Sequence, residues 1–322
     1  MREPFVGHER NFAQTLGAIM QNHNKEGGDP RSVFVTTQDG LRLHVRDYGW
    51  RNASAFPAVC LPGLARTVAD FDTLAPALAS GRSPRRVIAI DSRGRGQSEY
   101  DKNAENYNVV TELGDVITVL SSLGIGKAIF IGSSRGGILT MLLAAARPEM
   151  IAGALLHDIG PVIDLKGLAR IKSYVGKLPQ PCSFDEGADI LHRLFSAQFP
   201  RLTTEAWRAA ARRTWKISGG ALTPTYDVRL AETLVAIDAE HPLPPMWEQF
   251  DALASVPVLV IRGALSDLLS AETIAEMKKH HPAMRVIEVA DEGHVPLLAG
   301  DDLINAIVDF AAECDRAAGG GA

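Results

Sequence analysis

The chain has 322 residues, of which 46% are hydrophobic and 22% are charged, and its formal net charge is -5. This composition is typical of a folded globular protein and excludes a disordered or fibrous one. The mild negative charge argues against nucleic acid as a partner, because phosphate binding needs a concentrated basic face.

The sequence also lacks the features of membrane, secreted and metal-binding proteins. No apolar run approaches the roughly 20 residues that cross a bilayer, and the first residues have neither the apolar segment nor the cleavage site of a signal peptide. The three cysteines, Cys60, Cys182 and Cys314, are widely separated, so they indicate neither a disulfide framework nor a metal site. We expect a cytoplasmic protein with no membrane contact and no metal.

Residues 1–31 are predicted to form an N-terminal extension, because helically spaced apolar residues give way there to a stretch with Gly and Pro. The extension either packs on the main domain or forms a contact in an oligomer. The oligomeric state stays open, with a homodimer as one option.

Short apolar runs alternate with helical patterns from residue 32 onward, starting with a hairpin around the Asp39-Gly40 turn. Near-continuous apolar strands that alternate with helices predict a mostly parallel sheet covered on both faces. The expected strands are 33–37, 41–48, 58–61, 87–90, 128–131, 151–157, 256–262 and 285–289. The expected helices are 71–79, 109–123, 136–146, 271–280 and 303–314.

This alternation stops at residue 158 and resumes only after the Pro-dense stretch HPLPP. We therefore predict an α/β core made of 32–158 and 251–322, interrupted by a helical cap at 159–250. Most aromatic residues of the cap are expected to form its core. A basic helical stretch in the cap is either a solvated face or a means of selecting carboxylate-bearing substrates. Its members are Arg208, Arg212, Arg213 and Lys216.

The sharpest motif is Gly132-Ser133-Ser134-Arg135-Gly136, a G-x-S-x-G sequence between a predicted strand and a predicted helix. The central serine of such a motif occupies a tight, strained turn, and the glycines on either side remove Cβ atoms that would collide there. We predict Ser134 as a nucleophile.

A serine hydroxyl needs an adjacent base, and His294 follows the last predicted strand in a loop that can reach the sheet edge. Asp267 follows the next-to-last strand, where a carboxylate can accept from the other imidazole nitrogen and orient the ring. Asp158, at the end of an earlier strand, is the alternative, because both aspartates give the chain order Ser, Asp, His. We favour Asp267 for its loop position.

Acyl transfer also needs donors for the developing oxyanion, usually two backbone amides. The amide of Arg135, directly after the serine, is one candidate. The amide of Leu64 is the other, because Pro62 has no N–H and Gly63 lets the backbone approach closely.

Together these motifs resemble the α/β-hydrolase fold family, and in particular its capped serine esterase and lactonase-like members. The resemblance covers about residues 32 to 315 and is carried by LPGL (61–64), DSRGRGQS (91–98), GSSRGG (132–137), SD (266–267) and DEGH (291–294). It implies a mostly parallel eight-stranded sheet with the cap inserted after the sixth strand. It also implies that Asp91 and Arg93 hold a loop and take no part in catalysis.

The sequence departs from the family pattern at two positions. Pro62 stands where the family often has His, which leaves the Leu64 amide available. Arg135 stands where an apolar or amide side chain is more usual, and its guanidinium either favours anionic substrates or pairs with an acid. Family members that open epoxides or remove halides have an aspartate at the nucleophile position, so Ser134 argues against both activities.

The resulting hypothesis is a serine hydrolase that cleaves a small to medium carboxylic ester or lactone through an acyl-enzyme, with a small molecule as its partner and no cofactor. Hydrolysis of a C–C bond in a diketone and non-hydrolytic chemistry such as perhydrolysis remain alternatives within the same fold. A small-molecule receptor with vestigial turnover is the alternative outside enzymes.

Overall fold

The computed structural model describes residues 30–49, 55–235 and 243–319. The extension predicted at 1–31 therefore lies, apart from its last two residues, outside the described residues. No helix in the described ranges has the length and apolar character needed to span a bilayer.

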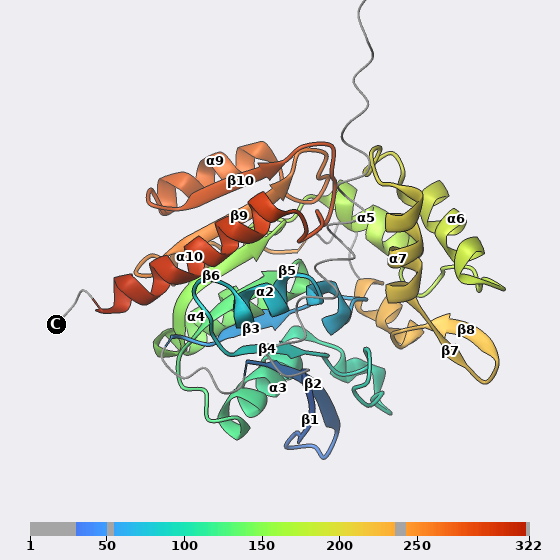
Figure 1. Cartoon of the computed structure of the whole chain (residues 1–322), viewed down its shortest axis with the longest axis horizontal. Coiled ribbons are helices and arrows are strands. Elements are labelled where there is room, and N and C mark those ends of the chain that lie inside the picture. Colours follow the sequence, from blue (N-terminus) through green and yellow to red (C-terminus); the bar gives the residue numbers. More distant parts are fainter. Residues whose placement is uncertain (1–29, 50–54, 236–242, 320–322) are drawn as a thin grey trace, which may run out of the picture.

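An eight-stranded sheet forms the centre of the molecule (Figure 1), in the order β1-β2-β4-β3-β5-β6-β9-β10. Strand β2 runs antiparallel to both its neighbours, and the pairs from β4 to β10 are all parallel. The strands are β1 (Arg31–Thr36), β2 (Arg42–Tyr48), β3 (Ala58–Leu61), β4 (Val87–Ile90), β5 (Ala128–Ser133), β6 (Ile151–His157), β9 (Val258–Gly263) and β10 (Arg285–Val289). The predicted fold class is confirmed.

Helices bury both faces of this sheet. Apolar residues of α2 and α10 belong to one core cluster, and those of α3, α4 and α9 belong to the other. Because both faces are covered, every residue of β5 and β6 is buried, which explains their continuous apolar sequence. The helices of the core are α2 (Leu74–Ser80), α3 (Val109–Ser122), α4 (Arg135–Ala146), α9 (Ala271–His280) and α10 (Asp301–Gly319), with 3-10 turns η1 (Val68–Phe71), η2 (Ala104–Asn106) and η3 (Pro148–Met150).

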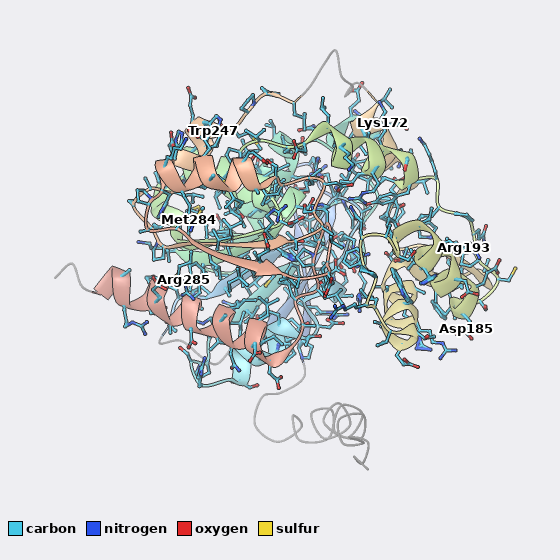
Figure 2. The ribbon with its side chains drawn as sticks, turned by 90° about the horizontal axis from the view of Figure 1, so that it is seen from above. Lys172, Asp185, Arg193, Trp247, Met284 and Arg285 are labelled. Atoms are coloured by element: carbon cyan, nitrogen blue, oxygen red, sulfur yellow. The ribbon has the colours of Figure 1, made fainter. Side chains whose placement is uncertain are left out.

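The segment between β6 and β9 extends beyond one edge of the sheet (Figure 1). In the view from above, Asp185 and Arg193 lie at its outer end, far from Met284 and Arg285 (Figure 2). Its helices are α5 (Leu165–Tyr174), α6 (Phe184–Phe195), α7 (Thr204–Thr214), η4 (Val228–Leu234) and α8 (Trp247–Asp251). Helices α6 and α7 share a separate apolar cluster around two buried tryptophans, Trp207 and Trp215.

The segment also contains a hairpin where only helices were predicted. Strands β7 (Trp215–Ser218) and β8 (Ala221–Pro224) pair antiparallel across Gly219 and Gly220. Both glycines have positive φ angles, 58° and 80°, which suit a two-residue hairpin turn. Lys216 consequently lies on a strand, and the basic stretch of helix α7 ends at Arg213.

Candidate active site

Ser134 occupies the sharp turn between β5 and α4 that the sequence motif predicts. Its φ angle is +49°, a left-handed conformation that costs energy for a residue with a side chain. A Cβ on Gly132 would lie 2.5 Å from the carbonyl oxygen of Gly136, and one on Gly136 would collide with the backbone of Leu61. The two glycines are thus required by close backbone approach, and the turn presents the Ser134 side chain at the sheet edge.

His294 lies between Ser134 and Asp158 and is hydrogen-bonded to both. Its Nε2 lies 2.9 Å from Ser134 Oγ, and its Nδ1 lies 2.8 Å from Asp158 Oδ2. With the proton on Nδ1, the ring donates to the carboxylate and accepts from the serine hydroxyl, which is the arrangement a general base needs. The side chain of His294 is 6% exposed and that of Asp158 is fully buried, so bulk water competes little with this contact.

Asp158 is held in place by the end of β9 and by the loop that follows it. The amide of Gly263 donates to its Oδ1 at 2.9 Å, and the hydroxyl of Ser266 donates to its Oδ2 at 2.6 Å. Its φ angle of +53° is one that Asp and Asn tolerate better than other non-glycine residues. These contacts fix the carboxylate so that one oxygen faces the imidazole.

The structure corrects the prediction that Asp267 orients His294. Asp267 instead receives two hydrogen bonds of 2.7 Å from Nε and Nη2 of Arg170 in α5, and its carbonyl accepts from the amide of Gly167. Burial acts to raise the pKa of Asp267, but the Arg170 guanidinium lowers it below its usual range. Asp267 therefore joins the segment after β6 to the loop after β9, and Asp158 takes the position beside the imidazole.

Ser133, the other hydroxyl of the motif, faces a different histidine. Its Oγ lies 3.1 Å from Nδ1 of His157, which is fully buried on β6. Burial lowers the pKa of His157 to about 4, so this ring stays neutral near neutral pH. Ser133 has its own partner, and Ser134 alone of the two hydroxyls is bonded to His294.

The residues of the predicted oxyanion hole lie beside Ser134. A Cβ on Gly63 would come within 3.6 Å of Ser134 Cβ, and a turn closed by the Arg66 amide and the Gly63 carbonyl carries Leu64. Arg135 begins α4 directly after the serine. The amides of Leu64 and Arg135 remain predicted donors.

A buried ion-pair network joins these two backbone segments. Arg95 donates from Nε to the Leu64 carbonyl and from Nη1 to Glu112, each at 2.7 Å, and Arg135 Nε donates to the other Glu112 oxygen at 2.6 Å. Burial acts to raise the pKa of Glu112, but the two guanidiniums hold it below its usual range. Of the two options for Arg135, the structure shows the pairing with an acid.

Asp91 and Arg93 have the contacts of loop-holding residues. Asp91 accepts from the amide of Val68 at 2.8 Å and lies 2.7 Å from His44 Nδ1. Arg93 forms a bidentate pair with Asp115, with both distances 2.7 Å. These contacts tie the loop after β4 to the strands and helices around it.

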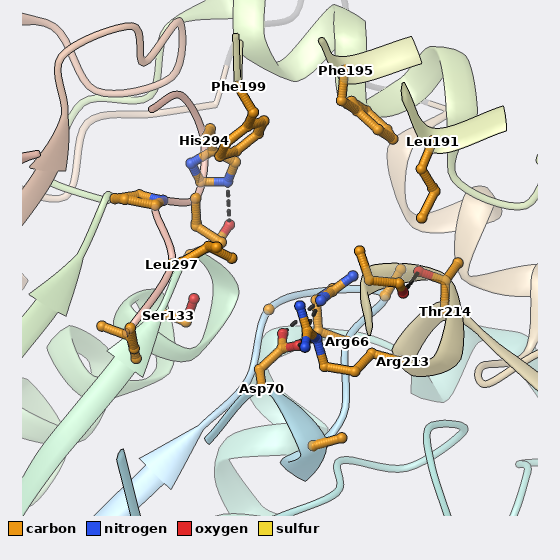
Figure 3. A pocket seen from close by; sticks show the side chains of 18 of the residues that line it. Arg66, Asp70, Ser133, Leu191, Phe195, Phe199, Arg213, Thr214, His294 and Leu297 are labelled. Carbon is orange, nitrogen blue, oxygen red and sulfur yellow. Dashed lines mark hydrogen bonds and ion pairs between the residues drawn. The ribbon is translucent and has the colours of Figure 1, made fainter. Parts of the chain in front are cut away.

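Two cavities meet at Ser134. One has a volume of about 330 Å³ and lies between Ser134, His294 and the inserted segment. The other, of about 1120 Å³, extends past Leu64 and Arg135 toward α8. Figure 3 shows the first cavity, with Phe195, Phe199 and Leu191 on one side and an ionic cluster on another. That cluster consists of Arg66, Asp70 and Arg213.

Sequence reasoning missed Arg66 and Asp70 and assigned Arg213 only to a basic stretch. Arg66 and Asp70 are four residues apart just after the predicted oxyanion loop, a spacing that hints at an ion pair. Nothing in the sequence shows that Arg213 meets them. Within the described residues, His, Cys, Asp and Glu form no group of three or more that could hold a metal ion.

The fold and the site define an α/β protein with a serine, a histidine and an aspartate joined at one edge of its sheet. The family model for the alpha/beta hydrolase fold matches residues 57–301. A solved alpha/beta hydrolase from Novosphingobium aromaticivorans is 36% identical, with a TM-score of 0.80 and coverage of 88% of this chain and 99% of that one. The chain belongs to the α/β-hydrolase fold family and is a hydrolase of this fold.

Two curated relatives are hydrolases as well. The 3-hydroxybutyrate-oligomer hydrolase of Cupriavidus necator is 36% identical over 278 residues, which cover 83% of this chain and 92% of the relative. The 2-(acetamidomethylene)succinate hydrolase of Mesorhizobium japonicum is 25% identical over 226 residues, which cover 70% of this chain and 77% of the relative.

Proposed function

We propose that the protein hydrolyses a small to medium carboxylic ester through an acyl-enzyme, with Ser134 as nucleophile, His294 as general base and Asp158 as the residue that orients His294. The contact between Ser134 Oγ and His294 Nε2, at 2.9 Å, is the observation that carries this proposal. It places the hydroxyl proton within reach of a base whose other nitrogen is held by a carboxylate.

In the first half of the proposed reaction, His294 takes the proton of Ser134 as Oγ attacks the ester carbonyl carbon. The oxyanion accepts hydrogen bonds from the amides of Leu64 and Arg135. The imidazolium then protonates the departing alkoxide as the ester C–O bond breaks. Asp158 stabilises the imidazolium in its fixed orientation.

In the second half, a water molecule gives its proton to His294 and attacks the acyl carbon of the Ser134 ester. The second tetrahedral intermediate collapses, and the Ser134 oxygen regains its proton from the imidazolium. The product acid leaves, and the enzyme returns to its starting state with no cofactor consumed.

As substrate class we propose linear oligomers of 3-hydroxybutyrate and esters of similar size. Support comes from the relative of Cupriavidus necator, because its identity of 36% extends over 92% of its length. The two cavities that meet at Ser134 give room on both sides of a scissile ester. Lactones of comparable size remain within this proposal.

Steady-state hydrolysis of short p-nitrophenyl esters and of 3-hydroxybutyrate oligomers tests the assignment. Ser134→Ala should lower kcat by roughly 10⁴-fold or more, because the nucleophile is lost while binding remains. Ser133→Ala is the matched control and should stay within about tenfold of the wild type, since Ser133 is bonded to His157 and not to His294.

Retention of most activity by Ser134→Ala would refute the nucleophile. If the wild type binds these esters tightly but turns them over negligibly, the protein is a small-molecule receptor and the enzyme hypothesis is wrong. Product analysis that shows cleavage of a diketone in preference to every ester would instead favour C–C bond hydrolysis.

A further inference from the structure

An unbalanced ionic cluster forms part of the wall of the first cavity. Arg66 donates to both carboxylate oxygens of Asp70, at 2.7 and 2.5 Å. Arg213 of α7 approaches the same carboxylate at 3.6 Å. Two guanidiniums thus share one carboxylate, and the cluster carries an excess positive charge.

The environment of Arg213 reflects this imbalance. Burial lowers the pKa of Arg213, and the neighbouring Arg66 cation lowers it further. The opposite effects of the Asp70 and Asp72 carboxylates on this pKa do not offset them. Asp72 has its own partner in Arg46. For Arg66, burial acts in the same direction, but the close Asp70 carboxylate raises its pKa above the usual range. The Asp70 carboxylate therefore neutralises mainly the charge of Arg66, and the charge of Arg213 is neutralised less.

The cluster is open to the cavity. The side chains of Arg66 and Arg213 are 34% and 27% exposed, so both retain surface that a ligand can contact. Both residues line the same cavity as Ser134 and His294. In Figure 3 the two guanidinium groups lie together across the cavity from His294 and Phe199.

Arg66 is also tied to the loop that carries the predicted oxyanion donor. The Arg66 amide donates to the Gly63 carbonyl at 3.2 Å, and Arg66 Cγ lies 3.3 Å from where a Gly63 Cβ would be. A cation on this turn keeps a fixed relation to the Leu64 amide and thus to the acyl-transfer centre. A substrate held here by a charged end would be aligned on the Ser134 hydroxyl.

Among the described residues that line it, the second cavity has no comparable cation beside Ser134. Its wall includes Ile138, Ile159 and Leu168, and the Arg135 guanidinium there is already paired with Glu112 at 2.6 Å. The two sides of Ser134 thus differ in chemistry. One side suits an anion, and the other suits an uncharged group.

We propose that Arg213, together with Arg66, is a binding site for a carboxylate at the far end of the substrate, so that the enzyme prefers esters whose alcohol portion ends in a free acid. This inference rests on the proposed ester hydrolysis and adds the charge and direction of the substrate. A guanidinium suits this role because its planar donors match the two oxygens of a carboxylate.

The competing explanation is purely structural. Arg213 comes from the inserted segment and Asp70 from the core, so their contact also joins the two parts of the molecule. In that case loss of either residue would loosen the same contact and affect charged and neutral esters alike. A carboxylate site predicts opposite effects, because Arg213 attracts the ligand and Asp70 repels it.

Calorimetric binding to the Ser134→Ala variant tests the proposal without turnover. The ligands are the linear 3-hydroxybutyrate dimer as its free acid and the same dimer with its carboxylate blocked as a methyl ester. We expect the free acid to bind about tenfold or more tightly than the methyl ester, because only its carboxylate can form charge-assisted hydrogen bonds with the two arginines.

Substitutions in the same background assign that preference to residues. Arg213→Gln should remove most of it by weakening only the free acid, whereas Asp70→Asn should strengthen binding of the free acid. Arg212→Gln is the matched control, because Arg212 is the adjacent arginine of α7 but is exposed and stacks over Phe184. It should leave the preference unchanged.

Equal binding of the two ligands to Ser134→Ala, or no binding of either, would overturn the carboxylate site. Equal losses for both ligands in Arg213→Gln and Asp70→Asn would do the same and would support the structural explanation. The proposed hydrolysis fails separately: binding with the expected preference to Ser134→Ala but no cleavage of either dimer by the wild type would leave the site intact and remove the activity.

Discussion

Two neighbouring loops at the same edge of the sheet each carry an aspartate, and the two aspartates have different partners. Asp158 directly follows β6 and lies 2.8 Å from His294 Nδ1. Asp267 follows β9, the strand paired with β6, and forms a bidentate contact with Arg170 in the inserted segment. A position after a parallel strand places a carboxylate at the functional edge but does not decide what it contacts.

The surrounding donors account for the difference. Gly263, the last residue of β9, donates its amide to Asp158, and Ser266 in the loop that follows donates its hydroxyl, so both hold that carboxylate against the imidazole. The same loop presents Asp267 to the other side, where α5 supplies a guanidinium. The two loops therefore cooperate: one provides the acid, and the other provides the contacts that aim it.

The largest expected effect separates the two aspartates directly. Asp158→Asn should lower kcat by roughly 10⁴-fold, because the amide cannot stabilise the imidazolium and favours the wrong tautomer of His294. Asp267→Asn should lower kcat by less than about tenfold. Steady-state ester hydrolysis by both variants, compared with the wild type, measures the difference.

Asparagine is a fair probe at position 158, because it tolerates the positive φ angle and keeps an oxygen for the Gly263 amide. Circular dichroism of the variant controls for folding. A large loss of kcat in Asp267→Asn, with a small one in Asp158→Asn, would reverse the assignment.

A second prediction concerns pH and the residue before Asp158. Burial lowers the pKa of His157 from 6.5 to about 4. Between these two pH values the His157 ring is protonated in the unfolded chain but stays neutral in the folded one. The free energy of unfolding should therefore fall between pH 6.5 and about 4, by on the order of 3 kcal/mol from this group.

Urea denaturation of the wild type and His157→Asn over that pH range measures this contribution. Asparagine can keep a hydrogen bond with Ser133 but carries no titrating ring, so the variant should lose less stability on acidification. Identical pH profiles for the two proteins would show that His157 does not contribute.

The smallest expected effect concerns the contact between Asp267 and Arg170. Asp267→Asn and Arg170→Gln should each lower the free energy of unfolding by about 2 kcal/mol, because each leaves a largely buried charge without its partner. The double variant should lose less than the sum of the two single losses. Strictly additive losses would show that the pair does not act as a unit.

Much of the fold could be predicted from the sequence, because the core obeys simple patterns. Strands β3, β4, β6 and β10 and helix α9 have the predicted bounds. For β3, β4 and β6 the reason is that strands buried on both faces are almost wholly apolar and turn residues mark their ends. The hairpin β7–β8 was missed because each strand has only 4 residues, and the alternation of apolar and polar residues in β7 is too short to separate it from the preceding helix.

The site was predictable where chemistry constrains local sequence. Ser134 was found because its tight turn requires glycines at 132 and 136. The choice between Asp158 and Asp267 depended on Arg170, which lies 97 positions from Asp267 in the sequence, and no local pattern reports such a contact. The meeting of Arg213 with Asp70 depends in the same way on how the inserted segment folds back over the core.

The rate of covalent labelling at Ser134 tests the central claim most directly, since it reports activation of the hydroxyl without any assumption about substrate. A fluorophosphonate should label the wild type at Ser134, as mapped by peptide mass spectrometry. The rate should fall roughly 10³-fold or more in Asp158→Asn and change little in Asp267→Asn. Labelling at another residue, or an equal loss of rate in both variants, would contradict the account.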